Sequence, residues 1–391
     1  MRPLALAALS VFCSTAALPV LAAEGAQAWP PKFTFSDETE VALTGNFAWD
    51  KAEFAGHPRL EDNEGLRRRE FGATVKKAGV WDAMVYFDFE SKSWLDVFVR
   101  FDSKHFFDRD LGKLRIGYMK VPVGLEGVTS SRAGTFMELA SPIQAIYQGR
   151  RTGVEWTLEQ DHALFQLGGY GGQDLQGDNP GQTYAARAAW TPRKAAGDVL
   201  HLGIAASREN PQGWTDGRGV QFDPTARLRA RPGTNLTDAR LVDTGSLAPV
   251  NHIQRTGLEG IWIKGPVSMQ GELLRADIAR DDGLADFTAE GGYVAASWLL
   301  TGESRVYSSG NVANPKPANG YGAVELAARY STLDLDDGLV NGGRQHDWTF
   351  GANWYLTPYV KLQANYVRAN ATRNGATSRP EIVEVRAQVH F

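Results

Sequence analysis

Cysteine is almost absent from this sequence, since the single residue, Cys13, lies within the first 23 residues. One cation, Arg2, precedes an apolar stretch over residues 4–21, and the small residues Ala22 and Ala23 follow it. This order is typical of a secretory signal peptide, so we predict that residues 1–23 are removed. A membrane anchor is the alternative, but the stretch is short, rich in Ala and Ser, and followed by no stop-transfer charges. The mature chain then has no cysteine and forms no disulfide.

Long apolar runs are also missing after residue 23. No later segment is apolar for long enough to span a bilayer as a helix, and the mean hydropathy is −0.32. A transmembrane β-barrel is compatible with this value, because its strands alternate lipid-facing apolar residues with lumen-facing polar ones. The 42 glycines and 10% aromatic residues fit such a barrel and equally fit a secreted β-sandwich. No linker marks a boundary, so we expect residues 24–391 to form one domain.

Catalytic and metal-binding motifs are missing as well. The sequence contains no GxSxG, HExxH, CxxC or Walker motif, and its seven histidines show no metal-ligand spacing. We therefore expect no catalytic residues, no metal site and no cofactor. A net charge of −4 also argues against general nucleic-acid binding. A barrel enzyme with a Ser/His pair at its rim, or an adhesin, is kept as an alternative.

Apolar and polar residues alternate along much of the chain. At its end, Val383, Val385, Ala387, Val389 and Phe391 alternate with polar residues, which indicates a β-strand with one apolar face. The same pattern is clear in 81–90, 95–102, 324–331, 348–356 and 360–366. Weaker segments raise the prediction to about sixteen strands, a size that porins use: 36–48, 66–77, 112–120, 150–158, 162–171, 183–192, 199–207, 253–263, 266–279 and 287–301.

The polar face of these strands distinguishes a barrel from a sandwich. Asp, Glu, Arg and Lys recur on it in strand after strand, which would be costly in a dry core and is cheap in a water-filled lumen. Aromatic residues such as Trp298, Trp348 and Tyr359 lie toward predicted strand ends, where interfacial girdles are expected. The loops range from a tight turn at 357–358 to the long stretch 208–252, so we expect short turns at one rim and long loops at the other. The fold class predicted is an all-β, antiparallel transmembrane barrel.

Two arginine clusters are candidates for an anion pathway. Arg227, Arg229 and Arg231 share one face of an extended segment, about 7 Å apart, and form a row of positive charge. The alternative is an exposed basic edge strand that discourages aggregation. In the run 67–69, all arginine, adjacent side chains of a strand point to opposite faces, so either Arg68 alone or the other two face the lumen.

Several stretches resemble the phosphate-selective porin O and P family, and the likeness covers almost the whole mature chain. The most specific is 116–126 (IGYMKVPVGLE), leading into 129–131 (TSS) and 135–138 (TFME), which looks like the family's strand and inward-folded constriction loop. The other matching stretches are 149–154 (GRRTGV), 229–233 (RARPG), 242–245 (VDTG), 325–331 (ELAARYS), 334–335 (DL), 353–356 (NWYL) and the terminal Phe391.

The resemblance implies an outer-membrane homotrimer in which a ladder of arginines draws small anions, phosphate among them, toward a constriction loop at about 121–149. The long loop at about 208–252 would carry the ladder, and neither catalysis nor nucleic acid is involved. A phosphate that loses hydration in a narrow pore needs charge-assisted hydrogen bonds in exchange. Carried over by position, the anion-pathway residues are Arg227, Arg229 and Arg231 in the ladder, Arg67 or Arg68 in the basic wall, and Lys120, Ser130 and Ser131 at the constriction loop.

Two positions depart from the family pattern. Leu139 stands where the family typically has an arginine, and Gly127 stands where it often has a lysine. Two cations fewer at the narrowest part should weaken phosphate binding and loosen selectivity. We therefore predict an anion-favouring porin, with phosphate as the narrower hypothesis. The alternatives are a weakly selective general porin or a porin for another small solute.

Overall fold

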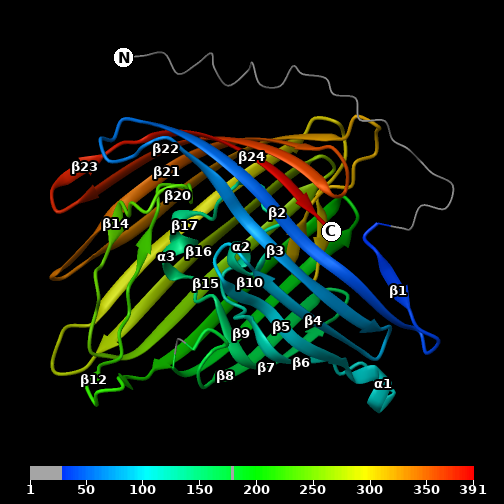
Figure 1. Ribbon diagram of the computed structural model, residues 1–391, viewed down its shortest axis with the longest axis horizontal. Helices are drawn as coiled ribbons and strands as arrows, with labels where there is room; N and C mark the ends of the chain where they lie inside the picture. The colour runs from blue at the N-terminus through cyan, green and yellow to red at the C-terminus, as the bar shows by residue number, and fades with distance from the viewer. Residues whose placement is uncertain (1–28, 178–179) are drawn as a thin grey trace.

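The computed structural model describes residues 29–177 and 180–391, so the predicted signal peptide lies outside the described residues. Within these ranges, 16 long antiparallel strands form a closed barrel (Figure 1), and β24 closes the ring by pairing with β2 from Asn46 against His390 to Ala55 against Glu381. The predicted fold class is thereby confirmed. The barrel strands are β2 (Thr39–Ala55), β3 (Asn63–Lys77), β4 (Trp81–Asp88), β5 (Ser93–Asp102), β6 (Lys113–Lys120), β7 (Arg150–Glu159), β8 (Ala163–Gly171), β9 (Gly181–Ala195), β10 (Asp198–Pro211), β15 (Val250–Lys264), β16 (Val267–Arg280), β17 (Phe287–Leu299), β20 (Ala323–Asp337), β21 (Val340–Tyr355), β22 (Val360–Arg373) and β24 (Glu381–His390).

Short elements decorate this ring. β1 (Lys32–Thr34) pairs with β2, and β23 (Ala376–Ser378) pairs with β22. Small ribbons are formed by β11 (Trp214–Thr215) with β12 (Gln221–Phe222), β13 (Arg229–Ala230) with β14 (Val242–Asp243), and β18 (Val306–Ser308) with β19 (Asn311–Ala313). The helices are α1 (Ser103–Phe107), α2 (Leu125–Val128) and α3 (Ser141–Ile146). Over the described part of the chain, no helix is long and apolar enough to cross a membrane.

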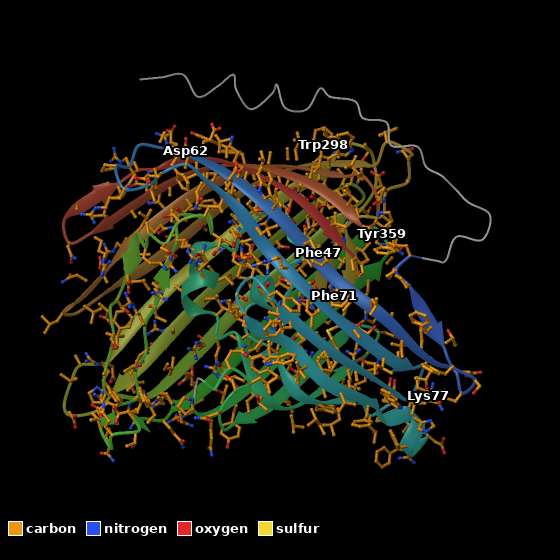
Figure 2. All side chains as sticks on the ribbon, in the orientation of Figure 1. Phe47, Asp62, Phe71, Lys77, Trp298 and Tyr359 are labelled. Carbon is orange, nitrogen blue, oxygen red and sulfur yellow. The ribbon has the colours of Figure 1, made fainter. Side chains whose placement is uncertain are left out.

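The strands bury their polar face and expose their apolar face. In β24, the side chains of Glu384, Arg386 and Gln388 point inward and are buried, whereas Val389 points outward and is 42% exposed. Figure 2 shows Phe47 on β2 and Phe71 on β3, whose rings are likewise exposed on the outer wall. A water-soluble protein has the reverse arrangement. An apolar outside is stable only against lipid, so the alternation read from the sequence places the wall in a membrane.

The two ends of the barrel differ. Residues 78–80, 160–162, 196–197, 265–266 and 356–359 make tight connections at one end, here called the short-turn rim. Trp298, Tyr359 and Lys77 mark this rim in Figure 2, and Asp62 marks the opposite one. The prediction of short turns at this end is wrong for two connections, 103–112, which carries α1, and 300–322. The connection 300–322 carries β18 and β19 and folds back into the barrel, where Val312 is buried against Leu125.

Two segments fill part of the interior. Residues 121–149, with α2 and α3, lie within the ring of strands (Figure 1). The segment 212–249, which joins β10 to β15, packs apolar residues against the inward faces of β16, β17 and β20. Leu228 and Val242 of this segment share one buried cluster with Ile278, Phe287 and Leu333 of the wall. The remaining lumen is thereby pushed toward β3–β7.

Candidate functional site: a cavity beside the constriction loop

A cavity of about 890 Å³ lies between β3–β7 and the inserted segment 121–149. The segment leaves the wall after Lys120 at the end of β6 and returns to it at Arg150, the first residue of β7. Lys120, Ser130, Ser131, Arg67 and Arg68 all line the cavity. The structure therefore brings five of the predicted site residues into one place.

Side chains of the opposite wall hold the main chain of the inserted segment. Nζ of Lys361, on β22, donates to the oxygens of Arg132 (3.1 Å) and Gly134 (3.0 Å). From β24, Nη1 of Arg386 donates to the oxygen of Met137 at 2.8 Å. Each charged group is buried and satisfies a main-chain carbonyl inside the barrel. The backbone of the segment is thus fixed by side chains of the wall.

The connection 300–322 holds the same stretch from the short-turn rim. Nη2 of Arg305 donates to the oxygen of Ala133 at 3.1 Å, and Nδ2 of Asn314 donates to the oxygen of Arg132 at 2.9 Å. Arg305 also bonds the hydroxyl of Tyr355. Two segments inserted from opposite rims therefore meet inside the barrel.

Both Arg67 and Arg68 point into the lumen, which corrects the expectation that adjacent arginines take opposite faces. Arg67 Nε donates to Glu138 Oε1 at 2.7 Å, and Arg68 Nη1 donates to Glu70 Oε1 at 2.6 Å. The cause is a β-bulge: Ala48 pairs with Arg68 and the next residue of β2 pairs with Leu66, so Arg67 is the extra residue. A bulge breaks the period of two on which the expectation was based.

At the constriction, Lys120 Nζ donates to the oxygens of Thr129 (2.7 Å) and Val128 (3.4 Å). Ser130 is exposed to the cavity, and Ser131 is half-buried. In the described ranges, Lys120 has no Asp or Glu partner at ion-pair distance. Its amino group is held by main-chain carbonyls of the constriction loop.

Arg132 and Arg150 are among the further basic residues that line the cavity and that the sequence analysis did not select. Arg132 donates to the hydroxyls of Thr44 (2.7 Å) and Tyr86 (2.8 Å), and its guanidinium lies 5.2 Å from the centre of the Tyr86 ring. Arg150 binds Asp96 at 3.0 Å. Arg132 follows the paired serines directly, but nothing in the motif marks it as a lining residue. Arg150 could have been suspected from its position at the end of the inserted segment.

The row of arginines lies elsewhere, on the segment 212–249. β13 covers Arg229 and Ala230, and the alternation extends beyond it, with Leu228 buried in the core cluster and Arg227 and Arg229 exposed. Arg227 binds Asp243 with Nη2 to Oδ2 at 2.5 Å, and this bond lowers the pKa of the Asp243 carboxyl. Arg231 is half-buried and binds Asp238 at 3.2 Å. These arginines do not line the cavity at the constriction.

Gly127 and Leu139, the two departures from the family pattern, both lie beside the cavity. A Cβ on Gly127 would lie 2.7 Å from the ring of Tyr147, so no longer side chain fits at this position unless Tyr147 moves. Leu139 packs at the edge of the core cluster and lines the cavity, as does Tyr147. Uncharged groups therefore occupy the places where the resemblance led us to look for cations.

Comparisons with known proteins agree with this architecture. Residues 41–391 match the family described as Phosphate-selective porin O and P. Porin O of Pseudomonas aeruginosa is 30% identical over 300 residues, which cover 66% of this chain and 65% of that protein. The matched region spans less than two thirds of the length of the curated relatives.

Solved structures share the fold at low identity. The anion-selective porin from Comamonas acidovorans matches with a TM-score of 0.59 and 13% identity, covering 90% of this chain and 100% of that one. The trimer form of OmpT, an outer membrane protein of Vibrio cholerae, matches with a TM-score of 0.58 and 11% identity, covering 90% and 99%. The chain belongs to the phosphate-selective porin O and P family, whose members are outer-membrane porins and not enzymes.

Proposed function

We propose that this protein is a passive diffusion channel for small anions. The observation that carries the proposal is a pair of basic side chains on the cavity, Lys120 and Arg132, whose hydrogen-bond acceptors are neutral oxygens. Arg132 is held there by hydroxyls of the wall. Positive charge in a narrow pore replaces part of the hydration of an anion and repels cations.

Phosphate or a related oxyanion is the narrower form of the proposal. Ser130 and Ser131 offer hydroxyls beside Lys120, which suits an oxyanion that has lost water. Arg227 and Arg229, exposed on the segment 212–249, would collect anions before they reach the constriction. The trimer form of OmpT and the family's substrate are the further support, and we extend the trimeric assembly to this chain as part of the proposal.

A weakly selective general porin is the second candidate. It is favoured by the acidic residues of the same cavity, since Glu70, Asp96, Glu138 and Glu155 each pair with a neighbouring arginine. Paired charges cancel at a distance, so the net field in the pore is smaller than the number of arginines suggests.

Ion selectivity of the purified protein in a planar bilayer separates the two candidates. In a potassium chloride gradient we expect a reversal potential on the chloride side, and we expect Lys120→Gln to move it toward zero. Lys264→Gln is the control, because Lys264 is exposed at the short-turn rim and pairs with Asp198 at 2.8 Å. A wild-type potential near zero would favour the general porin. Absence of block by millimolar phosphate would remove the phosphate form and leave the channel intact.

A further inference from the structure

The cavity beside the constriction has a basic side and an apolar side. Arg67, Arg68 and Lys120 belong to the wall strands β3 and β6. Half-buried apolar side chains also line it, and half of them come from the inserted segment: Met84, Leu95 and Phe98 from β4 and β5, and Val128, Leu139 and Tyr147 from residues 121–149. A solute at the constriction therefore meets cations and carbon surface together.

Apolar side chains in this position need an explanation, because the interior of a porin is ordinarily polar. Half-exposed carbon in a wet lumen keeps unfavourable contact with water, and covering it with an apolar solute removes that contact. Bare phosphate, which carries no apolar group, gains nothing from Leu139 or Phe98. An anion with a hydrocarbon part gains from both sides of the cavity.

The surroundings of Phe98 show how the two kinds of group are combined. The guanidinium of Arg115 lies over the Phe98 ring at 5.2 Å from its centre, and that of Arg100 lies over it at 6.0 Å. Arg115 is oriented by Glu155, with Nη2 to Oε1 at 2.5 Å, and Arg100 by Asp82, with Nε to Oδ2 at 2.9 Å. An anionic group that binds to these guanidinium groups therefore lies beside aromatic carbon, which suits an anion that carries a ring.

Tyr147 provides a second aromatic surface at the constriction itself. Its ring covers Gly127 so closely that no side chain can project there. The cations Lys120 and Arg150 line the same cavity at the two ends of the inserted segment. The pairing of aromatic carbon with cations is thus repeated along the lumen.

We propose that this pore prefers small organic anions, which carry a phosphate or carboxylate group on an aromatic or short alkyl group, over bare inorganic phosphate. This inference rests on the proposed anion channel and names its substrate class. The anionic group binds to the wall cations, and the hydrocarbon part lies against Phe98 and Leu139. Binding stays weak at each point, which lets the solute leave.

Block of the chloride current by two charge-matched probes tests the inference. Phenyl phosphate and inorganic phosphate are added separately to purified protein in a planar bilayer at about pH 9, where both are dianions. We expect half-block by phenyl phosphate at a concentration at least tenfold lower than that of inorganic phosphate. Phenol, which has the ring without the charge, is expected to block weakly.

Variants locate the effect. Phe98→Ala and Leu139→Gln should each reduce the tenfold ratio to threefold or less while chloride conduction persists. Phe350→Ala, on the lipid-facing side of β21, is the matched control and should leave the ratio unchanged. Equal potency of the two phosphates, or stronger block by inorganic phosphate, overturns the inference. A protein that conducts no chloride would instead overturn the proposed channel.

Discussion

Glu138 joins the constriction loop to the barrel wall through ion pairs. Its carboxylate binds Arg67 at 2.7 Å and Arg386 at 3.0 Å. Burial alone would raise the pKa of Glu138, but the arginines outweigh burial, and the pKa lies well below its usual value. A carboxyl whose pKa is lowered on folding stabilises the fold above its unfolded pKa of about 4.3 and loses this contribution only as the pH falls through the folded value.

The stabilisation that Glu138 contributes, measured as the difference in free energy of unfolding between the wild type and Glu138→Gln, should therefore stay constant between about pH 7 and pH 5, because Glu138 remains ionised throughout that range. Glu138→Gln should cost about 2–3 kcal/mol, the upper range for a hydrogen bond to a charged group, and increase open-channel noise at pH 7. Single-channel recording and thermal unfolding in detergent measure the two effects.

The control for Glu138→Gln is Glu53→Gln, since Glu53 is exposed and pairs with Lys51 at 3.6 Å. This change should leave both conductance and unfolding temperature unaltered. A stability difference between the wild type and Glu138→Gln that shrinks between pH 7 and pH 5 would contradict the assignment of a lowered pKa to Glu138.

Among the elements, the ribbon of β18 and β19 is the one that narrows the lumen from the short-turn rim. Its Ser309, Asn311 and Val312 line the cavity, and Tyr307 binds Nδ1 of His201 on β10 at 2.9 Å. The barrel closes without it, because β17 and β20 pair directly with each other. The ribbon is therefore an insertion that restricts the pore.

Deletion of residues 306–313 should raise the single-channel conductance while retaining anion preference. Arg305 and Asn314 remain at the junction, so the carbonyls that hold the constriction loop keep their partners. The matched control removes a ribbon that lies exposed, residues 214–222, and should leave the conductance unchanged. An unaltered conductance after the first deletion would show that the ribbon does not restrict ion flow.

The barrel strands could be predicted from the alternation of residues in the sequence, but the segments that fold into the lumen could not. Every segment picked out by alternation corresponds to a barrel strand, although β2 runs over Thr39–Ala55 where 36–48 was expected. A barrel strand faces lipid on one side and water on the other, so apolar and polar residues must alternate along it, and the sequence shows this alternation directly. The fold of 300–322 depends on contacts with a loop distant in sequence, and the bulge at Arg67 depends on how β3 is paired with β2. Neither produces a periodic pattern in the sequence.

At the scale of the whole molecule, the barrel has a boundary with lipid and an interior rich in ion pairs. Arg386 and Asp50, both nearly fully buried, bind at 2.6 Å across the closing pair of strands β24 and β2. On the outer face, Val294 and Leu273 are 49% and 64% exposed. The outer face is therefore the one on which a new charge should be least tolerated, because there it would meet hydrocarbon with no partner.

Substitution of Val294 by arginine, in the middle of β17 on the outer face, should cost about 2–4 kcal/mol of folding free energy in lipid bilayers. His346→Arg, on the outer face of β21 toward the rim opposite the short-turn rim, should cost about 0–1 kcal/mol, because the charge there reaches the membrane interface. Urea-dependent folding into liposomes measures both, and the matched side chain makes depth the variable. Equal costs at the two positions would mean that the wall around Val294 does not face hydrocarbon, and the assignment of the outer face to lipid would be wrong.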